Sequence, residues 1–203
     1  MPVCLKEDSC VAKAKRITDL DIQAPTAKNA RIIAQTRLDE LFSWAGYADD
    51  AFRIHELHNM RIAAKRLRYT LEIFEDVLPD GVASIIEEVT QLQEELGALH
   101  DNDVSVALLR LCLSSGDSGT VYEDALMKAA QAEPQGKSLV NPELVAYVVD
   151  AKYVPDAEQR QGLEALLRNL EQQRVEHYSA FRQHWYTLQA HDFKRQVLDA
   201  IAE

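Results

Sequence analysis

Glycine and proline are scarce in this chain, with seven and six residues among 203. An all-β fold needs many tight turns, and these two residues supply most of them, so the composition favours helices. No run approaches about 18 consecutive apolar residues, and the N-terminal MPVCLKEDSC lacks the apolar stretch of a signal peptide. We therefore expect neither a membrane-spanning helix nor secretion.

Cysteine is also rare. Cys4, Cys10 and Cys112 are odd in number and match no zinc-binding spacing. We expect two exposed thiols near the N-terminus and one buried thiol, at Cys112, that acts as a small hydrophobic residue. A chain without a disulfide framework is typical of a reducing compartment, which predicts a cytoplasmic protein.

Basic residues are outnumbered, with 22 Lys and Arg against 33 Asp and Glu, and the formal net charge is -11. This balance argues against general binding to duplex DNA or to anionic membranes, which usually requires a basic surface. It does not exclude a local anion site, because salt confines surface fields to roughly 8–10 Å. Acidic surroundings would restrict such a site to a dense polyanion.

One segment departs from this acidic character. Within HELHNMRIAAKRLRY (55–69), five basic side chains occur in eleven residues, and no acid follows the second histidine. On a helix that advances about 100° per residue, four of the five form one stripe that borders the apolar face, while Arg66 lies off it. The stripe consists of His58, Arg61, Lys65 and Arg68.

The stripe lacks the acidic partners that an exposed helix face usually carries. A Glu four residues before Lys or Arg stabilises a helix, but positions 57, 61 and 64 hold Leu, Arg and Ala. Only Glu72 follows Arg68 at pair spacing. Like charges three and four residues apart cost roughly 0.2–0.5 kcal/mol each. Because a bound anion would offset this cost, we interpret the stripe as a binding surface rather than a solvated helix face.

Hydrophobic periodicity predicts long helices separated by short breaks. We expect Asp49 or Asp50 to cap the second helix, and Asp101 or Asp103 to cap the one that begins at 104. A short helix is predicted over 121–132, and 143–150 is helix or strand. The main helices are expected at about 26–45, 50–78, 82–99, 104–113, 156–188 and 193–202.

Two of these helices carry cations on their apolar faces. Arg37 lies among apolar positions of the first helix, and Arg174 with His177 falls on the inward arc of the 156–188 helix, where Leu166 is also expected. A buried arginine must pair with a carboxylate, reach the rim of the bundle or line an internal polar channel. Because these two helices and the helix that carries the stripe all direct cations towards a shared centre, we favour the channel.

These motifs resemble a known family. The run HNMRIAAKRLR (58–68) is similar to the H-x-x-R-x-x-x-(K/R)-R-L-R signature of the CHAD family, the conserved histidine α-helical domain. LGALHDNDV (96–104) resembles the family's LG-x-x-(R/H)-D-x-D-V segment, and Arg174-x-x-His177 resembles a counterpart in the second half. The family's F-x-x-x-W and F-K-R-Q patterns follow at Phe181, Trp185 and Phe193–Gln196. The resemblance covers roughly 26–113 and 156–203.

The resemblance implies an all-α fold of two pseudo-repeated antiparallel helical bundles around a basic central pore or groove. After an N-terminal extension (1–24), one domain would span 25–203, with a first half to about 113, a variable middle (114–155) and a second half. The implied partner is inorganic polyphosphate, at polyphosphate granules. Many relatives are fused to a triphosphate-processing domain, for which this chain has no room, so we expect no hydrolase activity from it.

We expect polyphosphate to contact basic side chains of several helices, as multivalent binding of a long anion requires. Arg offers planar two-point hydrogen bonding to phosphate and Lys a mobile point charge. The expected binding residues are Arg37, His58, Arg61, Lys65, Arg68, Arg174 and His177, with Arg31, Arg66 and Lys194 as second choices.

Two alternatives remain open. His100, Asp101 and Asp103 resemble a fragment of a metal-dependent phosphohydrolase, but metal hydrolysis needs three or four converging ligands and no second His–Asp cluster is evident. We therefore expect no enzyme activity, metal or cofactor. The other alternative is a helical adaptor for RNA or protein; RNA binding favours aromatic residues for base stacking, and Tyr69 is the only one beside the stripe. The sequence leaves the oligomeric state open.

Overall fold

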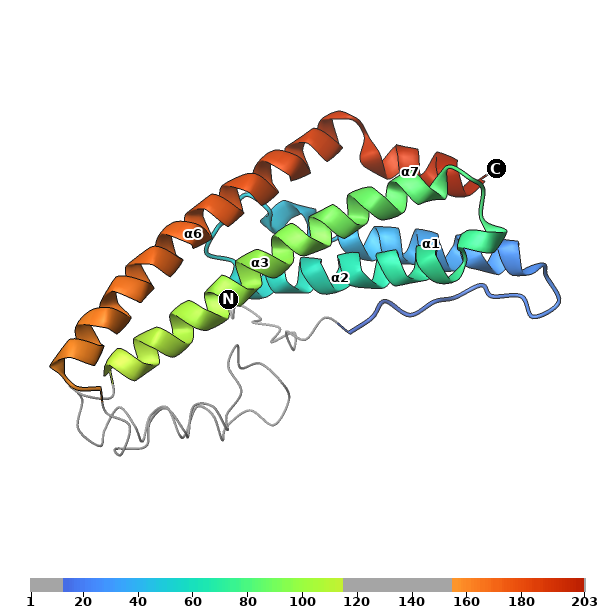
Figure 1. Ribbon diagram of the computed structural model, residues 1–203. Helices are drawn as coiled ribbons and strands as arrows, with labels where there is room; N and C mark the ends of the chain where they lie inside the picture. Colours follow the sequence, from blue (N-terminus) through green and yellow to red (C-terminus); the bar gives the residue numbers. More distant parts are fainter. Residues whose placement is uncertain (1–12, 115–154, 203) are drawn as a thin grey trace, which may run out of the picture.

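The computed structural model describes residues 13–114 and 155–202 (Figure 1). The helices are α1 (Thr26–Phe42), α2 (Ile54–Ile73), α3 (Val82–Ser114), α6 (Ala157–Ala190) and α7 (Phe193–Ala202), with short 3₁₀ helices η1 (Ala45–Tyr47) and η2 (Glu75–Val77). These ranges contain no strand, and the prediction of an all-α fold is confirmed.

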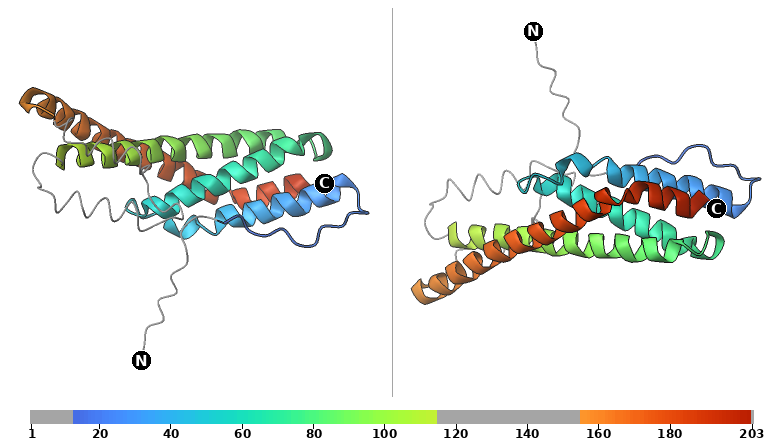
Figure 2. Two further views of the ribbon diagram at one scale, coloured as in Figure 1. Left: turned by 90° about the horizontal axis from the view of Figure 1, so that it is seen from below. Right: turned by 90° about the horizontal axis from the view of Figure 1, so that it is seen from above.

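Consecutive helices of the described residues pack against each other. α2 packs between α1 and α3, α6 packs mainly along α3, and α7 packs on α1 with further contacts to α3 and α6. The views from below and above show α6 crossing α3 at an angle and α7 lying beside α1 (Figure 2). α3 therefore has α2 and α6 as its neighbours along the middle of the bundle.

One hydrophobic core joins these helices. Three aromatic rings of α6 and α7, Phe181, Trp185 and Phe193, are at most 1% exposed. Ala63 and Ala64 of α2 are fully buried, and such small side chains at a contact allow helices to approach closely. Full burial of each large apolar side chain stabilises the fold by about 1.5–3 kcal/mol. The predicted pseudo-repeat and basic pore stay predictions.

The predicted start of α6 is confirmed, and its cause is a capping box. The Asp156 carboxylate accepts a hydrogen bond from the Gln159 backbone N–H at 2.9 Å, and the Gln159 side chain accepts one from the Asp156 N–H at 3.0 Å. Two otherwise unpaired donors of the first turn are satisfied in this way.

The predicted break at 100–103 is wrong. α3 continues from Val82 to Ser114, so neither Asp101 nor Asp103 caps a helix there. Asp103 is only 5% exposed and its carboxylate forms an ion pair with Arg174 of α6. Asp and Asn disfavour a helix interior by only about 0.7 kcal/mol or less, and the ion pair together with packing on both sides overrides that preference.

The predicted cap of the second helix is also wrong. α2 begins at Ile54, its N-cap is Arg53, and no side chain caps it. Asp50 instead accepts a hydrogen bond from the Phe52 N–H at 2.9 Å within the preceding turn, and Asp49 binds Arg182 of α6 at 3.1 Å. α1 and α2 each end a few residues earlier than predicted, because η1 and η2 carry the chain out of them.

Two burial predictions fail as well. Leu166, expected on the inward face of α6, is 45% exposed. Cys112 is half-buried rather than buried, and burial raises the pKa of its thiol. Cys4, Cys10 and the elements predicted over 121–132 and 143–150 lie outside the described residues. Among the described helices, none combines the length and apolar character needed to cross a membrane.

Candidate anion-binding site

The stripe lies along the edge of the buried face of α2, and each of its residues is half-buried. At one end of the stripe, His58 contacts His100 of α3. The predicted position of the stripe beside the apolar face is therefore confirmed. The buried apolar residues of α2 are Leu57, Met60, Ala63, Ala64, Leu67 and Leu71.

Two cations of the stripe have no carboxylate partner in the part of the chain that the structure describes. Neither Arg61 nor Lys65 forms an ion pair there, and the buried Nε of Arg61 has no hydrogen-bond partner. Arg68 lies 3.6 Å from Glu72, which confirms the pair expected from their spacing. Lys65 Nζ and the Arg68 guanidinium lie 5.5 and 4.8 Å from the ring centre of Tyr69. The ring thus holds two cations at a surface where it is itself 43% exposed.

A histidine pair joins the stripe to α3. The Nδ1 atoms of His58 and His100 are 3.2 Å apart, and the ring centres are 4.3 Å apart. Burial lowers the pKa of His58 to about 4, with further lowering by His100, Arg61 and His55. Burial and then Arg61 also lower the pKa of His100. Both rings are therefore neutral near pH 7, and one Nδ1–H donates to the other ring.

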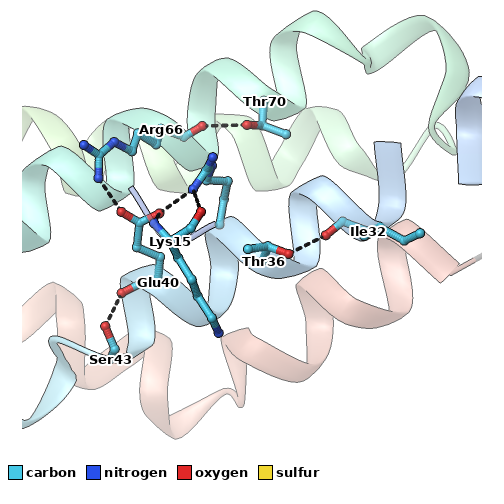
Figure 3. A network of polar contacts seen from close by, with 8 residues as sticks. Lys15, Ile32, Thr36, Glu40, Ser43, Arg66 and Thr70 are labelled. Carbon is cyan, nitrogen blue, oxygen red and sulfur yellow. Dashed lines mark hydrogen bonds and ion pairs between the residues drawn. The ribbon is translucent and has the colours of Figure 1, made fainter. Parts of the chain in front are cut away.

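A second cluster of cations lies between α1 and α2, around Glu40. The side chain of Glu40 is only 6% exposed; its Oε2 accepts a hydrogen bond from Arg37 at 2.7 Å, and its Oε1 pairs with Arg66. Glu40 also accepts from the Lys15 N–H at 3.3 Å, while Arg37 donates to the Lys15 carbonyl at 2.9 Å. Figure 3 shows the Glu40 carboxylate between Arg66 and the backbone of Lys15. This cluster ties α1, α2 and the segment before α1 together.

A third cluster lies between α3 and α6. Arg174 pairs with Asp103 and donates a hydrogen bond to the Ala51 carbonyl at 2.6 Å. His177 Nδ1 lies 3.2 Å from the side-chain nitrogen of Asn102. Three alternatives were given for an inward arginine, and Arg174 follows the first of them by pairing with a carboxylate. Arg37 does the same with Glu40. The preferred alternative, a shared basic channel, stays a prediction.

The remaining two predicted residues lie on α7 and α1. Lys194 forms an ion pair with Asp39 at 2.8 Å and lies 5.6 Å from the ring centre of Phe42, so it links α7 to α1. The Nε of Arg31 is buried and has no hydrogen-bond partner among residues 13–114 and 155–202. By their contacts, the ten predicted residues thus divide into the stripe, the Glu40 cluster, the Asp103 cluster, and the separately placed Lys194 and Arg31.

The contact between His100 and the stripe was not predicted from the sequence, because a break between two helices was expected at 100–103. The sequence did contain a sign of a continuous helix. Buried apolar residues recur at helical spacing through this segment, at Leu92, Leu96, Leu99 and Val106. Asp103 occupies one position of that period. The role of Glu40 as a shared buried partner was missed as well.

The three side chains of the proposed phosphohydrolase fragment are used separately. His100 contacts His58, Asp103 pairs with Arg174, and Asp101 is exposed. Among residues 13–114 and 155–202, no three His, Cys, Asp or Glu side chains lie together in a way that could hold a metal ion.

Comparison with known proteins identifies one family. The family model of the CHAD domain matches residues 7–110, just over half of the chain. The chain belongs to the CHAD domain family. The matched segment contains the whole stripe and His100 but ends before α6, so Arg174 and His177 lie beyond it. No curated protein and no solved structure matches this CHAD chain.

Proposed function

We propose that this CHAD protein binds inorganic polyphosphate, without hydrolysing it, through the stripe on α2. One observation carries the proposal: Arg61 and Lys65 are without carboxylate partners within the described residues, in a chain whose net charge is -11. Carboxylates elsewhere in the chain pair with other predicted cations. Membership of a family that is linked in general to polyphosphate binding supports the same partner.

The chemistry of the stripe suits a chain of phosphates. Polyphosphate carries about one negative charge per phosphate, so binding would release counterions as it does at a nucleic-acid backbone. The guanidinium of Arg61 presents two parallel N–H groups to phosphate oxygens, whereas the Lys65 ammonium on its flexible stem follows successive phosphates. Because several modest contacts add along one ligand, affinity should grow with chain length.

The cations that pair with buried carboxylates have a different role in this proposal. Glu40 pairs with both Arg37 and Arg66, and Asp103 pairs with Arg174. Recruiting these arginines to a ligand would leave a buried carboxylate without its partner, which is costly. We assign them to holding α1 and α6 against α2 and α3, so that the stripe is presented on a rigid surface.

A charge-matched pair of variants tests the proposal. Arg61→Gln/Lys65→Gln removes one Arg and one Lys from the stripe, and Lys28→Gln/Arg195→Gln removes the same charges from side chains that are 60% and 70% exposed elsewhere. A charge-assisted hydrogen bond contributes about 1.5–3 kcal/mol, and about 1.4 kcal/mol is a factor of ten. We therefore expect the stripe variant to lose at least about tenfold in affinity for long-chain polyphosphate, and the control about twofold or less.

The salt dependence gives a second readout of the same titrations. The slope of log affinity against log salt should fall by roughly 0.7 for each stripe cation removed, as for single-stranded nucleic acids. Equal losses in the two variants would mean that net charge, not the stripe, attracts the anion. Release of orthophosphate from the bound polymer would contradict the non-catalytic part of the proposal.

Single-stranded RNA is the second candidate ligand, because Tyr69 lies exposed between Lys65 and Arg68 and offers one ring for base stacking. Competition separates the two: polyphosphate should displace RNA at equal phosphate concentration, and Tyr69→Leu should weaken RNA binding more than polyphosphate binding. For polyphosphate we further propose a place at cytoplasmic polyphosphate granules, to which a fluorescent fusion should localise only while the stripe is intact.

A further inference from the structure

The contact between His58 and His100 exists only in certain protonation states. Their Nδ1 atoms face each other at 3.2 Å, and a hydrogen bond between two imidazole nitrogens needs one N–H donor and one bare acceptor. When both rings are protonated, two N–H groups and two positive charges oppose each other. When the neutral pair has taken up two protons, one on each ring, this link between α2 and α3 must therefore break.

The pair is surrounded by charges of both signs, and burial together with Arg61 outweighs the nearby carboxylates. Arg61, one turn after His58 on α2, disfavours protonation of both rings, and burial acts in the same direction. Asp101 and Asp103 of α3 oppose these effects at His100, but Asp103 is already paired with Arg174. The charged and titratable groups that face the pair are His55 and Arg61 from α2, Asp101 and Asp103 from α3, and Arg174 of α6 through Asp103.

An anion at the stripe would reverse this balance. Arg61 is half-buried and has no carboxylate partner among the described residues, so a phosphate held by its guanidinium would lie about one helical turn from His58. The negative charge would offset the positive field of Arg61 at both rings, and a protonated ring could donate a hydrogen bond to phosphate.

We propose that polyphosphate binding is coupled to proton uptake by the His58–His100 pair, with His100 acting as a binding residue beside the stripe. The inference rests on the proposed polyphosphate binding. The proton comes from solvent, one N–H bond forms on an imidazole, and no other bond changes. By linkage, uptake on binding means that affinity rises as pH falls. For one proton the rise approaches about tenfold per pH unit between the free and bound pKa values of the pair.

Calorimetry in two buffers measures the uptake directly. Long-chain polyphosphate is titrated into the full chain at about pH 6, once in MES and once in Bis-Tris, whose different ionisation enthalpies report the protons exchanged. We expect uptake of about one proton per site at about pH 6 and close to none at about pH 8. Binding with no uptake at the lower pH would overturn the inference and leave the proposed function intact, whereas absence of binding would overturn both.

Histidine variants assign the proton. His58→Gln/His100→Gln should abolish the uptake and flatten the pH dependence of affinity, because glutamine keeps polar hydrogen bonding without titrating. His55→Gln is the matched control, an exposed histidine one turn earlier on the same helix, and it should retain the uptake. Uptake that persists in the double variant, or disappears in the control, would overturn the assignment.

An NMR titration of the unaltered protein tests the same inference if the double variant folds poorly. The imidazole Cε1–H resonances of His58 and His100 are followed by NMR against pH with and without polyphosphate. We expect the ligand to raise the pKa of at least one of the two rings. Unchanged titration of both rings in the saturated complex would contradict the proposal.

Discussion

Replacing Asp103 by alanine removes the carboxylate that Arg174 binds inside the bundle. The Asp103 side chain is 3% exposed and that of Arg174 is 16% exposed. Removing one partner of a buried ion pair costs about 3–5 kcal/mol, because the remaining charge is left without compensation. Arg174 keeps its hydrogen bond to the Ala51 carbonyl at 2.6 Å and reaches water in part. We therefore expect a loss at the lower end, about 3 kcal/mol.

Urea unfolding followed by circular dichroism measures this loss, and thermal unfolding should show a Tm lower by about 6–12 °C for a chain of this size. Two controls isolate the ion pair. Asp199→Ala removes the partner of Arg195 in a pair that is 63% and 70% exposed, and should cost about 0.5 kcal/mol or less. Asp103→Leu/Arg174→Met replaces both charges by apolar side chains and should cost less than Asp103→Ala alone.

A cost below about 1 kcal/mol for Asp103→Ala, the level of an exposed pair, would show that Asp103 and Arg174 do not form a stabilising buried ion pair. The double variant also tests the division of roles between the cations. If Arg174 holds α6 against α3 and does not bind the ligand, the folded Asp103→Leu/Arg174→Met protein keeps its polyphosphate affinity within about twofold. A loss of about tenfold, equivalent to about 1.4 kcal/mol, would place Arg174 in the binding site.

Two further predictions concern other parts of the bundle. His184 lies 2.8 Å from Glu95 and 3.1 Å from Glu88 of α3, and the hydrogen bond to Glu95 is the main cause that raises its pKa. Protonation of His184 therefore stabilises the fold below about pH 6.5, and this contribution is lost as pH rises through the raised pKa. The Tm of His184→Gln should be lower than that of the parent protein at acidic pH and equal to it at alkaline pH. Asp156→Ala removes the capping box with Gln159, and urea unfolding should report a loss of about 1 kcal/mol. An unchanged midpoint for His184→Gln at acidic pH, or for Asp156→Ala, would contradict the role given to that residue.

Local patterns were sufficient for much of the fold. The Pro155-Asp156 start of α6, the terminal α7 helix and the burial of Phe181 and Trp185 follow from capping chemistry and from a period of 3.6 residues. The helical wheel also placed the stripe correctly beside the buried face of α2. These features depend on residues within a few turns of each other, which sequence reasoning can reach.

Pairing across the fold could not be predicted in the same way. Glu40 and Arg66 are 26 positions apart, and Asp103 and Arg174 are 71 apart, so no local spacing shows that they meet. The same limit explains the false break at 100–103: HDND has the composition of a cap, and only the partner on α6 makes a buried Asp103 favourable. Which cations keep a carboxylate partner is therefore a property of the packed bundle and not of any single helix.

The structure of the protein with a short polyphosphate bound would test the central claim most directly. We predict phosphate oxygens within hydrogen-bonding distance of Arg61 and Lys65, with the Glu40 and Asp103 ion pairs unchanged. An anion seated on Arg37 and Arg66, or on Arg174, with the stripe unoccupied, would contradict it.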